Sequence, residues 1–588
     1  MLDISPPKLK LIWVQGALTF ARKDLELDAE YIIVQNGTLT IGTEKEPFEQ
    51  HALITLHGTP DAVDLPIYGS KVLACRFCTL DLHGRPYARS WTRLRESVNE
   101  GKNGYDIWAY QNGGVDGNTI TCANIECTKV DIAKGDRVIK LQDRVDWPRG
   151  SHIIVAPSSF RKDECALSNR QTRPVTTLPP QTSSEVANYL CHRRYEEAFV
   201  DEVLEGGRAL LLREPLKYTH WGKTVYYDEK GIAHEGNYSI PFYAEVGLLS
   251  RTVVIQGSPN SLAPNLFGAT MFLHSEGDES LTARLSWIEL RRAGQSFRVG
   301  RYPLHFHMIG NVRNSYVRSC SVHHTFNRAV TLHGINYLRL EYNVVFNVLG
   351  HAIFVEDGIE HKNVFWYNLA ILAKQSNALL NTDLTPALFW ITNPDNTLVG
   401  NVAIGSQSYG FWYMAEPAGV VDLIHFQGRV SAEELQTLGT CPAGEPLLRF
   451  EKNKAASNSR YGLRVYAQTG ESLLGRAKPC EPPSESNPYV PNVFKDFLGL
   501  RNKKVGAIFS GKIAKVHLKN FIVADNAVAG IEMPAAQGAG LFGEWGDNII
   551  EDTVVVGSSR FNRSFDIDQE PTYAFAHAQS LMVCLAPR

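Results

Sequence analysis

An internal repeat in the C-terminal half of the chain limits its fold more than any other sequence feature. Six segments align without gaps, and their fourth position is Asn in five segments and Cys in the first. The first two steps between these positions are 23 and 25 residues, and later steps are longer where loops are inserted. Such a period, with β-rich runs and no helical pattern, is typical of a parallel β-helix, whose coils bury their apolar faces by stacking. The fourth positions are Cys320, Asn343, Asn368, Asn401, Asn453 and Asn520.

The repeat predicts a right-handed parallel β-helix over residues 285–555, with the Asn residues at equivalent corners. Asn tolerates the left-handed backbone of a tight corner, and stacked amides can bond from coil to coil. A chance alignment of Asn-rich turns is the alternative. Cys320, which takes the place of Asn in the first segment, is expected to be a buried and unreactive thiol.

The remainder of the chain also favours β-structure. Only residues 184–205 and 431–438 have helical periodicity. Between residues 10 and 82, short β-rich runs alternate with glycines, which mark tight turns because glycine accepts positive φ. These runs predict a small β-sandwich or a short solenoid, so the expected fold class of the whole chain is all-β.

Two groups of motifs resemble a known family. Residues 27–48 (LDAEYIIVQNGTLTIGTEKEPF) and 79–94 (TLDLHGRPYARSWTRL) are similar to the G8 domain. Residues 301–310 (RYPLHFHMIG), 323–334 (HHTFNRAVTLHG) and 349–363 (LGHAIFVEDGIEHKN) are similar to a parallel β-helix region. That region is found in cell-surface hyaluronidase and the hyaluronan-binding cell-migration-inducing protein, and the resemblance to fibrocystin-like proteins is more distant.

The resemblance implies an order of domains along the chain. We expect a G8 domain over residues 8–156, a β-rich connecting region with an insertion over 157–284, the β-helix over 285–555, and a C-terminal tail over 556–588.

Charge and hydropathy exclude two classes of protein. The chain has 62 acidic residues against 59 Lys and Arg, a formal net charge of −3, which argues against a nucleic-acid-binding protein. No apolar run approaches the roughly 18 residues of a membrane-spanning helix. The N-terminal residues lack the pattern of a signal peptide, which taken alone indicates a cytosolic protein. The resemblance implies instead an extracellular or cell-surface location, and we expect this chain to be a fragment, or the product of an incomplete gene model, of such a protein.

Cysteines and sequons favour the extracellular interpretation. Cys441 and Cys480 bracket an insertion, and we expect a disulfide between them if their Cα atoms lie within about 7 Å. A zinc site at Cys75 and Cys78 is a weaker hypothesis, because no second pair stands at the spacing of a zinc ribbon. Sequons for N-glycosylation stand at Asn36, Asn237 and Asn562.

The repeat alignment predicts which side chains point out of the β-helix. Side chains alternate along a strand, so the positions between core residues face outward. Coils stack about 4.8 Å apart, so His307, His333 and Glu356 should form a row within about 10 Å on a solvent-exposed face. The expected outward columns are His305, Thr331, Phe354, Leu379 and Trp412, and beside them His307, His333, Glu356, Asn381 and Met414.

Three interpretations of this row stay open. It is a solvated ladder without a ligand, a site for a divalent metal of unknown identity, or a site of acid–base chemistry without metal. The candidate metal ligands are His305, His307, His333 and Glu356.

The resemblance implies binding and depolymerisation of a hyaluronan-like polysaccharide on the β-helix. The alternative is a non-catalytic cell-surface or ciliary coat protein of the fibrocystin-like type. The alignment places Asp383 about 8 Å from Glu356, a separation that glycoside hydrolysis permits. The candidate catalytic residues are His333, Glu356, Asp357 and Asp383, and the candidate substrate-binding residues are Arg301, Arg328, Phe354 and Trp412.

Overall fold

The computed structural model describes most of the chain. The described residues are 1–99, 136–158, 195–228, 238–376, 381–415, 441–466, 475–481, 484–511, 513–533 and 548–557, together with the backbone of the strands Val115–Asp116, Thr119–Cys122, Ile125–Cys127, Gly231–Ala233 and Tyr573–Phe575.

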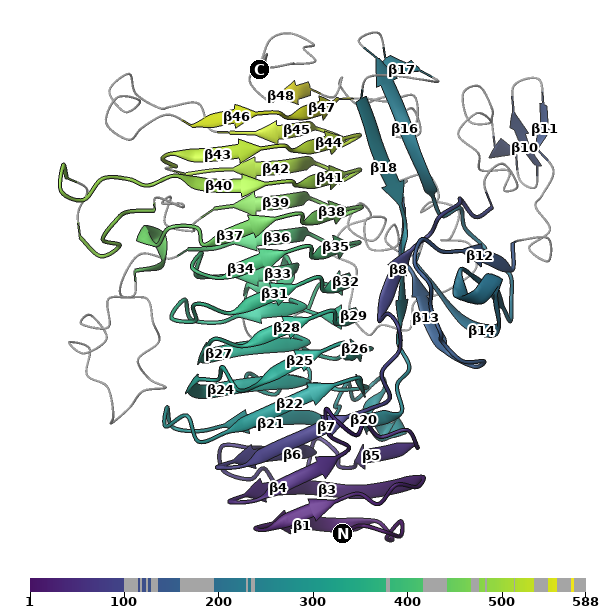
Figure 1. Ribbon diagram of the computed structural model, residues 1–588, viewed down its shortest axis with the longest axis vertical. Helices are drawn as coiled ribbons and strands as arrows, with labels where there is room; N and C mark the ends of the chain where they lie inside the picture. Colours follow the sequence, from purple (N-terminus) through teal and green to yellow (C-terminus); the bar gives the residue numbers. More distant parts are fainter. Residues whose placement is uncertain are drawn as a thin grey trace.

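The chain winds into a parallel β-helix with three rows of strands (Figure 1). The stack begins with β1 (Leu9–Val14) and β3 (Leu25–Gln35), which pair in parallel. The first row continues through β5 (Ala52–Leu56), β20 (Val253–Gly257), β23 (Ile288–Arg291), β26 (Ser321–His323), β29 (Val344–Leu349), β32 (Leu369–Lys374), β35 (Val402–Ile404), β38 (Lys454–Ala456), β41 (Leu498–Leu500), β44 (Ile522–Ala524) and β47 (Val554–Val556).

The other two rows follow the same coils. The second row consists of β6 (Val72–Arg76), β21 (Thr270–His274), β24 (Leu304–Asn311), β27 (Val330–Asn336), β30 (Ile353–Val355), β33 (Ala387–Ile391), β36 (Tyr409–Tyr413), β39 (Tyr461–Val465), β42 (Val505–Phe509), β45 (Ala529–Glu532) and β48 (Tyr573–Phe575). The third row consists of β2 (Ala17–Thr19), β4 (Thr38–Ile41), β7 (Thr79–His83), β22 (Thr282–Ser286), β25 (Tyr316–Arg318), β28 (Arg339–Glu341), β31 (Val364–Trp366), β34 (Thr397–Val399), β37 (Arg449–Glu451), β40 (Asn492–Lys495), β43 (Val516–Lys519) and β46 (Ile549–Glu551).

The strands of the N-terminal segment belong to this stack. β5 pairs in parallel with β20, β6 with β21, and β7 with β22, so the first coils lead directly into the later ones. One hydrophobic core runs through all of them, from Val14 to Val555. Of the two N-terminal folds that the glycine pattern allowed, the structure therefore has the solenoid. The domain boundaries given above stay predictions.

Antiparallel strands lie beside the β-helix (Figure 1). One six-stranded sheet is ordered β12 (Val138–Lys140), β15 (Ala209–Leu212), β14 (Glu196–Leu204), β13 (His152–Val155), β19 (Glu245–Leu248) and β8 (Trp91–Arg93). Two small sheets consist of β9 (Val115–Asp116), β10 (Thr119–Cys122) and β11 (Ile125–Cys127), and of β16 (Gly222–Asp228), β17 (Gly231–Ala233) and β18 (Tyr238–Tyr243). The buried Glu245 of β19 joins the side sheet to the β-helix through an ion pair with Lys454, 2.8 Å away.

The all-β prediction is confirmed, with one local correction. The helical elements of the described residues are short 3₁₀ turns, η2 (Glu205–Gly207), η3 (Pro259–Ser261), η4 (Asn381–Leu384) and η6 (Pro442–Gly444). The helix expected over residues 184–205 is wrong where it can be checked, because residues 196–204 form β14, whose side chains are alternately buried and exposed at its start. Residues 431–438 lie outside the described residues.

The predicted Asn ladder forms the corner between the third and first rows. The Nδ2 atoms of Asn343, Asn368 and Asn401 donate to the Oδ1 atom of the next Asn, ending at Asn453, over 2.9, 3.0 and 3.1 Å. Each Oδ1 also accepts a backbone N–H from the preceding coil, beginning with that of Cys320. Cys320 itself is a buried free thiol, as expected.

Asn520 does not belong to this ladder, which corrects the alignment. Register pairs Lys454 with Leu498 and Leu498 with Ile522, so the ladder position of the later coils is taken by Phe497 and Phe521. Their rings pack in the core with centroids 5.2 Å apart. Asn520 stands one residue earlier, exposed and with φ +55°, where Asn relieves the strain of a left-handed backbone.

The cysteine predictions are partly resolved. Cys441 and Cys480 form a disulfide with Cα atoms 5.3 Å apart, which confirms that pair. Cys75 and Cys78 are also joined as a disulfide rather than exposed as metal ligands. Among the sequons, Asn36 is exposed on a turn, whereas Asn237 and Asn562 lie outside the described residues.

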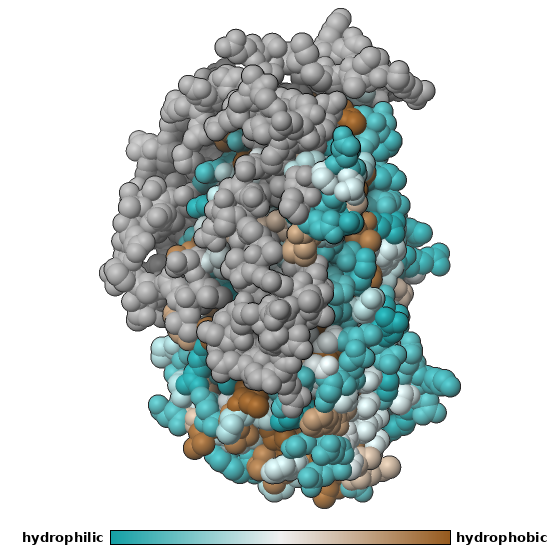
Figure 2. Space-filling view, turned by 90° about the vertical axis from the view of Figure 1, so that its left-hand side faces the viewer, coloured by the Kyte–Doolittle hydropathy of each residue, from teal (hydrophilic) through white to brown (hydrophobic). Residues whose placement is uncertain are grey.

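The surface of the described residues carries both hydrophilic and hydrophobic side chains. Figure 2 shows hydrophilic residues over much of the described surface and hydrophobic ones gathered toward the end that holds the first coils. Leu11 and Trp13 of β1, on the terminal coil, are among the exposed apolar side chains. No helix among the described residues has the length and apolar character needed to cross a bilayer.

Candidate functional site

One column of side chains on the second row points away from the hydrophobic core. Register places these side chains one above another on successive strands from β24 to β39, because each stands between two core residues of its strand. The column consists of His305, Thr331, Phe354, Trp390, Trp412 and Arg464.

The structure corrects this column at one coil. Phe354 pairs with Trp390, which takes the position that the alignment gave to Leu379; Leu379 itself lies outside the described residues. The reason is the extra length of chain between β32 and β33, which the ungapped alignment ignored. Asn381, expected beside the column, belongs instead to η4, and Thr392 follows β33 in the place that Glu356 takes after β30.

The column is buried, which contradicts the expected solvent-exposed face. His305, Phe354 and Trp412 are 1%, 3% and 5% exposed. The ring of Tyr302 lies 4.8 Å from that of His305, and the guanidinium of Arg328 lies 3.8 Å above the ring of Phe354. These side chains come from loops between coils, which the strand alignment does not include.

Three histidine rings from two coils meet beside this column. His307 lies opposite His333 in the strand register, and their ring centroids are 4.8 Å apart. The centroids of His305 and His307 are 5.0 Å apart, and one nitrogen of each of the three rings lies within 4.8 Å of the others. Sequence reasoning therefore grouped these three residues correctly in space.

The histidine group includes a fourth member that sequence reasoning missed. His274 of β21 lies opposite His307, and their Nδ1 atoms are 2.9 Å apart. Its sequence signal is the spacing Phe272–His274, which matches His305–His307 one coil later. The alignment began one coil too late to include it.

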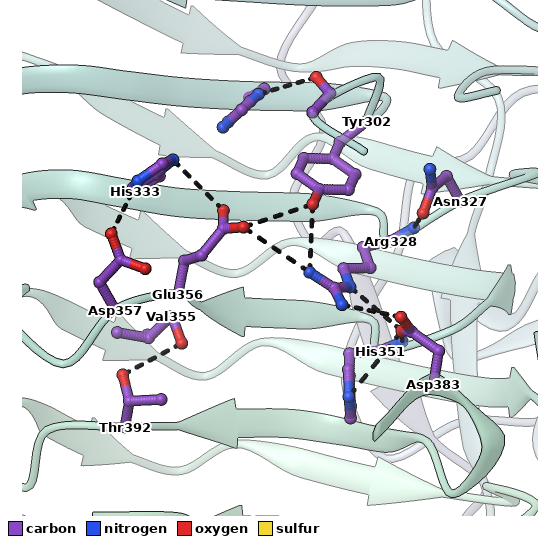
Figure 3. Close-up of polar contacts among 12 residues, drawn as sticks. Tyr302, Asn327, Arg328, His333, His351, Val355, Glu356, Asp357, Asp383 and Thr392 are labelled. Carbon is purple, nitrogen blue, oxygen red and sulfur yellow. Dashed lines mark hydrogen bonds and ion pairs between the residues drawn. The ribbon is translucent and has the colours of Figure 1, made fainter. Parts of the chain in front are cut away.

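His333 lies between two carboxylates (Figure 3). Its Nδ1 atom is 3.4 Å from Glu356 Oε2, and its Nε2 atom is 2.8 Å from Asp357 Oδ2. Burial by itself lowers the pKa of His333, but the charges of Glu356 and Asp357 outweigh burial and raise the pKa to about 9. At neutral pH this imidazole therefore carries a positive charge shared with two acids.

Glu360 is a further acid that sequence reasoning did not identify. Its carboxylate is fully buried and accepts the backbone N–H groups of Gly334 and Gly358 over 2.8 and 2.9 Å. Burial, with the nearby charge of Asp357, raises the pKa of Glu360 to about 7. It anchors the turn that carries Asp357.

Arg328 and Asp383 form a buried ion pair on the other side of Glu356 (Figure 3). Arg328 donates to both oxygens of Asp383 over 3.1 and 2.7 Å and to the hydroxyl of Tyr302 over 3.1 Å. Its Nη1 atom is 3.9 Å from Glu356 Oε1.

This pairing corrects the expected position of Asp383. Asp383 belongs to η4 rather than to a strand, so the separation from Glu356 derived from strand geometry does not apply. Both of its oxygens are engaged by Arg328, which makes Asp383 the counter-ion of that side chain. Arg301 stands apart from this pair, donates to the carbonyl of Ile67 and lies over the ring of Phe272.

The outward column carries buried polar atoms without a hydrogen-bond partner among the described residues. Buried polar atoms are nearly always paired in folded proteins, so a line of exceptions on one face calls for an explanation. The atoms are His305 Nε2, Thr331 Oγ1, Trp390 Nε1, Trp412 Nε1 and Arg464 Nε.

Two protein families and several longer proteins are similar in sequence to this chain. Residues 1–95 match the G8 domain, and residues 266–463 match the family described as CEMIP beta-helix. Fibrocystin-L of Mus musculus is 31% identical over 95% of this chain, and cell surface hyaluronidase CEMIP2 of Homo sapiens is 27% identical over 74%. By identity the match to fibrocystin-L is the higher of the two, which reverses the order expected from the motifs.

These relatives are much longer proteins. The chain spans 12% of fibrocystin-L and 31% of CEMIP2. Among solved structures, the catalytic domain of a GH87 alpha-1,3-glucanase in complex with nigerose matches 84% of this chain and all of that chain, at 10% identity and a TM-score of 0.28, which is too low to support an argument. The two family matches confirm the resemblance seen in the motifs: this chain carries a G8 domain and a β-helix of the CEMIP type.

Proposed function

We propose that the outward column binds an anionic polysaccharide of the hyaluronan class and that the adjoining acids cleave it. The observation that carries the proposal is the line of buried, unpartnered polar atoms from His305 to Arg464 beside the charged group of His333, Glu356 and Asp357. A polar chain lying along the solenoid would supply the missing partners coil by coil, since coils repeat about every 4.8 Å.

The column offers two kinds of contact for a charged sugar polymer. Trp390 and Trp412 carry aromatic rings, and sugar rings have apolar faces that stack on aromatic ones, whereas the ring of Phe354 is already covered by Arg328. Arg464 lies 4.3 Å from the ring of Trp412 and donates to the hydroxyl of Tyr409 over 2.8 Å. Its guanidinium is suited to the carboxylate of a uronic acid, because it binds planar anions through several N–H groups.

Cleavage of a glycosidic bond needs a proton donor for the leaving oxygen and a carboxylate on the other side of the sugar. Glu356 and Asp357 lie on either side of the His333 ring, and the group holds a proton at neutral pH because the pKa of His333 is about 9. We assign Glu356 the role of base or nucleophile, with Arg328 holding its other oxygen. Asp357 and His333 then share the proton that the leaving oxygen takes.

The substrate class and the location also rest on the relatives. CEMIP2 is named a cell surface hyaluronidase, which supports hyaluronan as the first polymer to test. Disulfides such as Cys441–Cys480 persist in oxidising compartments, which supports an extracellular or cell-surface location.

A non-catalytic coat or adhesion role is the second candidate. It is favoured by the match to fibrocystin-L, which is higher in identity and covers more of this chain than the match to CEMIP2. In that case the column would hold the polymer without cleaving it.

The deciding experiment is incubation of the full chain with fluorescent hyaluronan, read by the length of the polymer. Wild type should shorten the polymer, and Glu356→Gln should reduce the rate by about 100-fold or more, the usual contribution of a general acid or base. Glu341→Gln, the same change in the third row, should cleave like wild type. Binding without shortening by wild type would establish the second candidate, and absence of both would defeat the two together.

A further inference from the structure

His305 has one nitrogen fixed by the backbone and the other left without a partner. Its Nδ1–H donates to the carbonyl of Gly300 over 2.9 Å, so in the neutral ring Nε2 carries the lone pair. The side chain is 1% exposed, and Nε2 has no hydrogen-bond partner among the described residues. A buried acceptor of this kind costs about 1–3 kcal/mol unless something binds it.

The two neighbouring rings can turn a lone pair to the same point. The Nδ1···Nδ1 contact between His274 and His307 needs one ring to donate, and His274 Nδ1 also lies 3.3 Å from the carbonyl of His307. Binding of an ion requires the tautomer in which His307 is the donor, so that its Nε2 atom keeps a lone pair. Each nitrogen of His333 faces a carboxylate, Glu356 at Nδ1 and Asp357 at Nε2. Whichever nitrogen turns to a ligand, the other retains a carboxylate partner, the arrangement that orients metal-binding histidines.

We propose that His305, His307 and His333 bind a divalent transition metal of the zinc class, with a fourth position open to water or a ligand oxygen. Three imidazole nitrogens suit zinc and its neighbours, and a set of three protein ligands with an open position is the pattern of catalytic zinc sites. The nitrogens already lie within 4.8 Å of one another, and small side-chain rotations would bring them to about 2.0–2.1 Å from one ion.

This ligand set differs from the one expected from the sequence. Glu356 becomes the carboxylate partner of the ligand His333 rather than a ligand itself. Gly300 and His274 contact the second nitrogen of His305 and of His307. A bound ion would supply a Lewis acid beside Glu356 and Asp357. Any use of that ion in cleavage would rest on the proposed function, whereas the metal site rests on the histidine geometry alone.

The test uses the full chain after removal of metals with a chelator. Titration with Co²⁺, followed by visible absorption and repeated with Zn²⁺ by calorimetry, should show one tightly bound ion for each chain. His305→Gln and His307→Gln should weaken binding by about 100-fold or more, because each removes one of three ligands. His361→Gln, a half-buried histidine at a coil corner, should bind like wild type, and circular dichroism should verify that all variants are folded.

Each outcome bears on one inference. If wild type binds no Co²⁺ or Zn²⁺, or if His305→Gln and His307→Gln bind these ions like wild type, the metal site is overturned. If the metal binds as expected but hyaluronan is never shortened, the metal site stands and the proposed cleavage falls. If cleavage persists in chelator with no metal bound, the proposed cleavage stands and does not depend on the metal.

Discussion

The Asn ladder and the outward column are both rows of buried side chains stacked along one β-helix, yet they treat their polar atoms differently. In the ladder, the side-chain amides of Asn368 and Asn401 form hydrogen bonds to the coil before and to the coil after, so each amide nitrogen and oxygen has a partner. In the column, His305 Nε2, Trp390 Nε1 and Trp412 Nε1 are buried without a partner. Stacking explains the ladder fully and leaves the column unexplained, so only the column points to a ligand.

The charged residues beside the column also differ from the ladder, because stability alone does not explain their burial. An interior built for stability alone gains little from ion pairs, because the cost of removing charges from water offsets their attraction. Arg328, Asp383 and His333 nevertheless lie buried beside the partly exposed Glu356. We therefore expect changes in the ladder to alter folding, and changes in the column to alter binding and pH dependence.

The largest effect is expected for Asn401→Ala. This change removes the partners of the Phe365 carbonyl and the Asn368 N–H, which are both buried. With each unpaired group costing about 1–3 kcal/mol, the free energy of unfolding should fall by about 3–5 kcal/mol, measured by urea denaturation. Asn520→Gly is the matched control, since Asn520 is exposed with positive φ, and it should change stability by less than about 0.5 kcal/mol. Equal losses in both variants would show that the ladder adds nothing.

A smaller effect, visible only against pH, is expected for His333→Gln in the presence of chelator. The folded chain raises the pKa of His333 from 6.5 to about 9, so the protonated ring stabilises the fold fully below about pH 6.5. That contribution is lost as pH rises to about 9. A rise of this size corresponds to about 3 kcal/mol, which should be the difference in unfolding free energy between wild type and variant near pH 6. A difference that stays constant from pH 6 to pH 9.5 would contradict the assignment.

The smallest effect on stability is expected for Trp412→Phe. Phe keeps an aromatic ring beside Trp390, whose centroid is 4.6 Å away, and removes an indole N–H that has no partner, so unfolding should change by less than about 1 kcal/mol. Binding of hyaluronan oligosaccharides should weaken by about 10-fold, which is 1.4 kcal/mol, measured by calorimetry.

The inward neighbour of Trp412 gives the opposite pattern. Phe411 lies fully buried against Phe389 in the core, so Phe411→Leu should lower stability by about 1–2 kcal/mol and leave oligosaccharide binding unchanged. If Trp412→Phe binds the oligosaccharides like wild type, Trp412 contributes to packing and not to binding.

The alignment of the repeat was correct wherever the inserted residues lie outside the aligned segments. The ladder from Asn343 to Asn453 and the outward direction of His305 and His333 then follow from the repeat and from alternation along each strand. The alignment failed at the second-row strand β33, because the insertion between β32 and β33 falls inside the aligned segment. Trp390 consequently took the place expected for Leu379. At the far end, Asn520 was one residue out of register, since a lone Asn before Phe521 satisfies the same local pattern.

The sequence by itself determined the periodic part of this protein: an all-β solenoid, its Asn corners, and the three histidines that share a face. Those features depend on local alternation and on a repeat that any stacked coil must obey. Only the tertiary structure decided that this face is buried, that His274 joins the group and that Asp383 neutralises Arg328. Such contacts bring together loops between different coils, among them Tyr302 and η4, and the path of those loops is set by packing rather than by any local pattern.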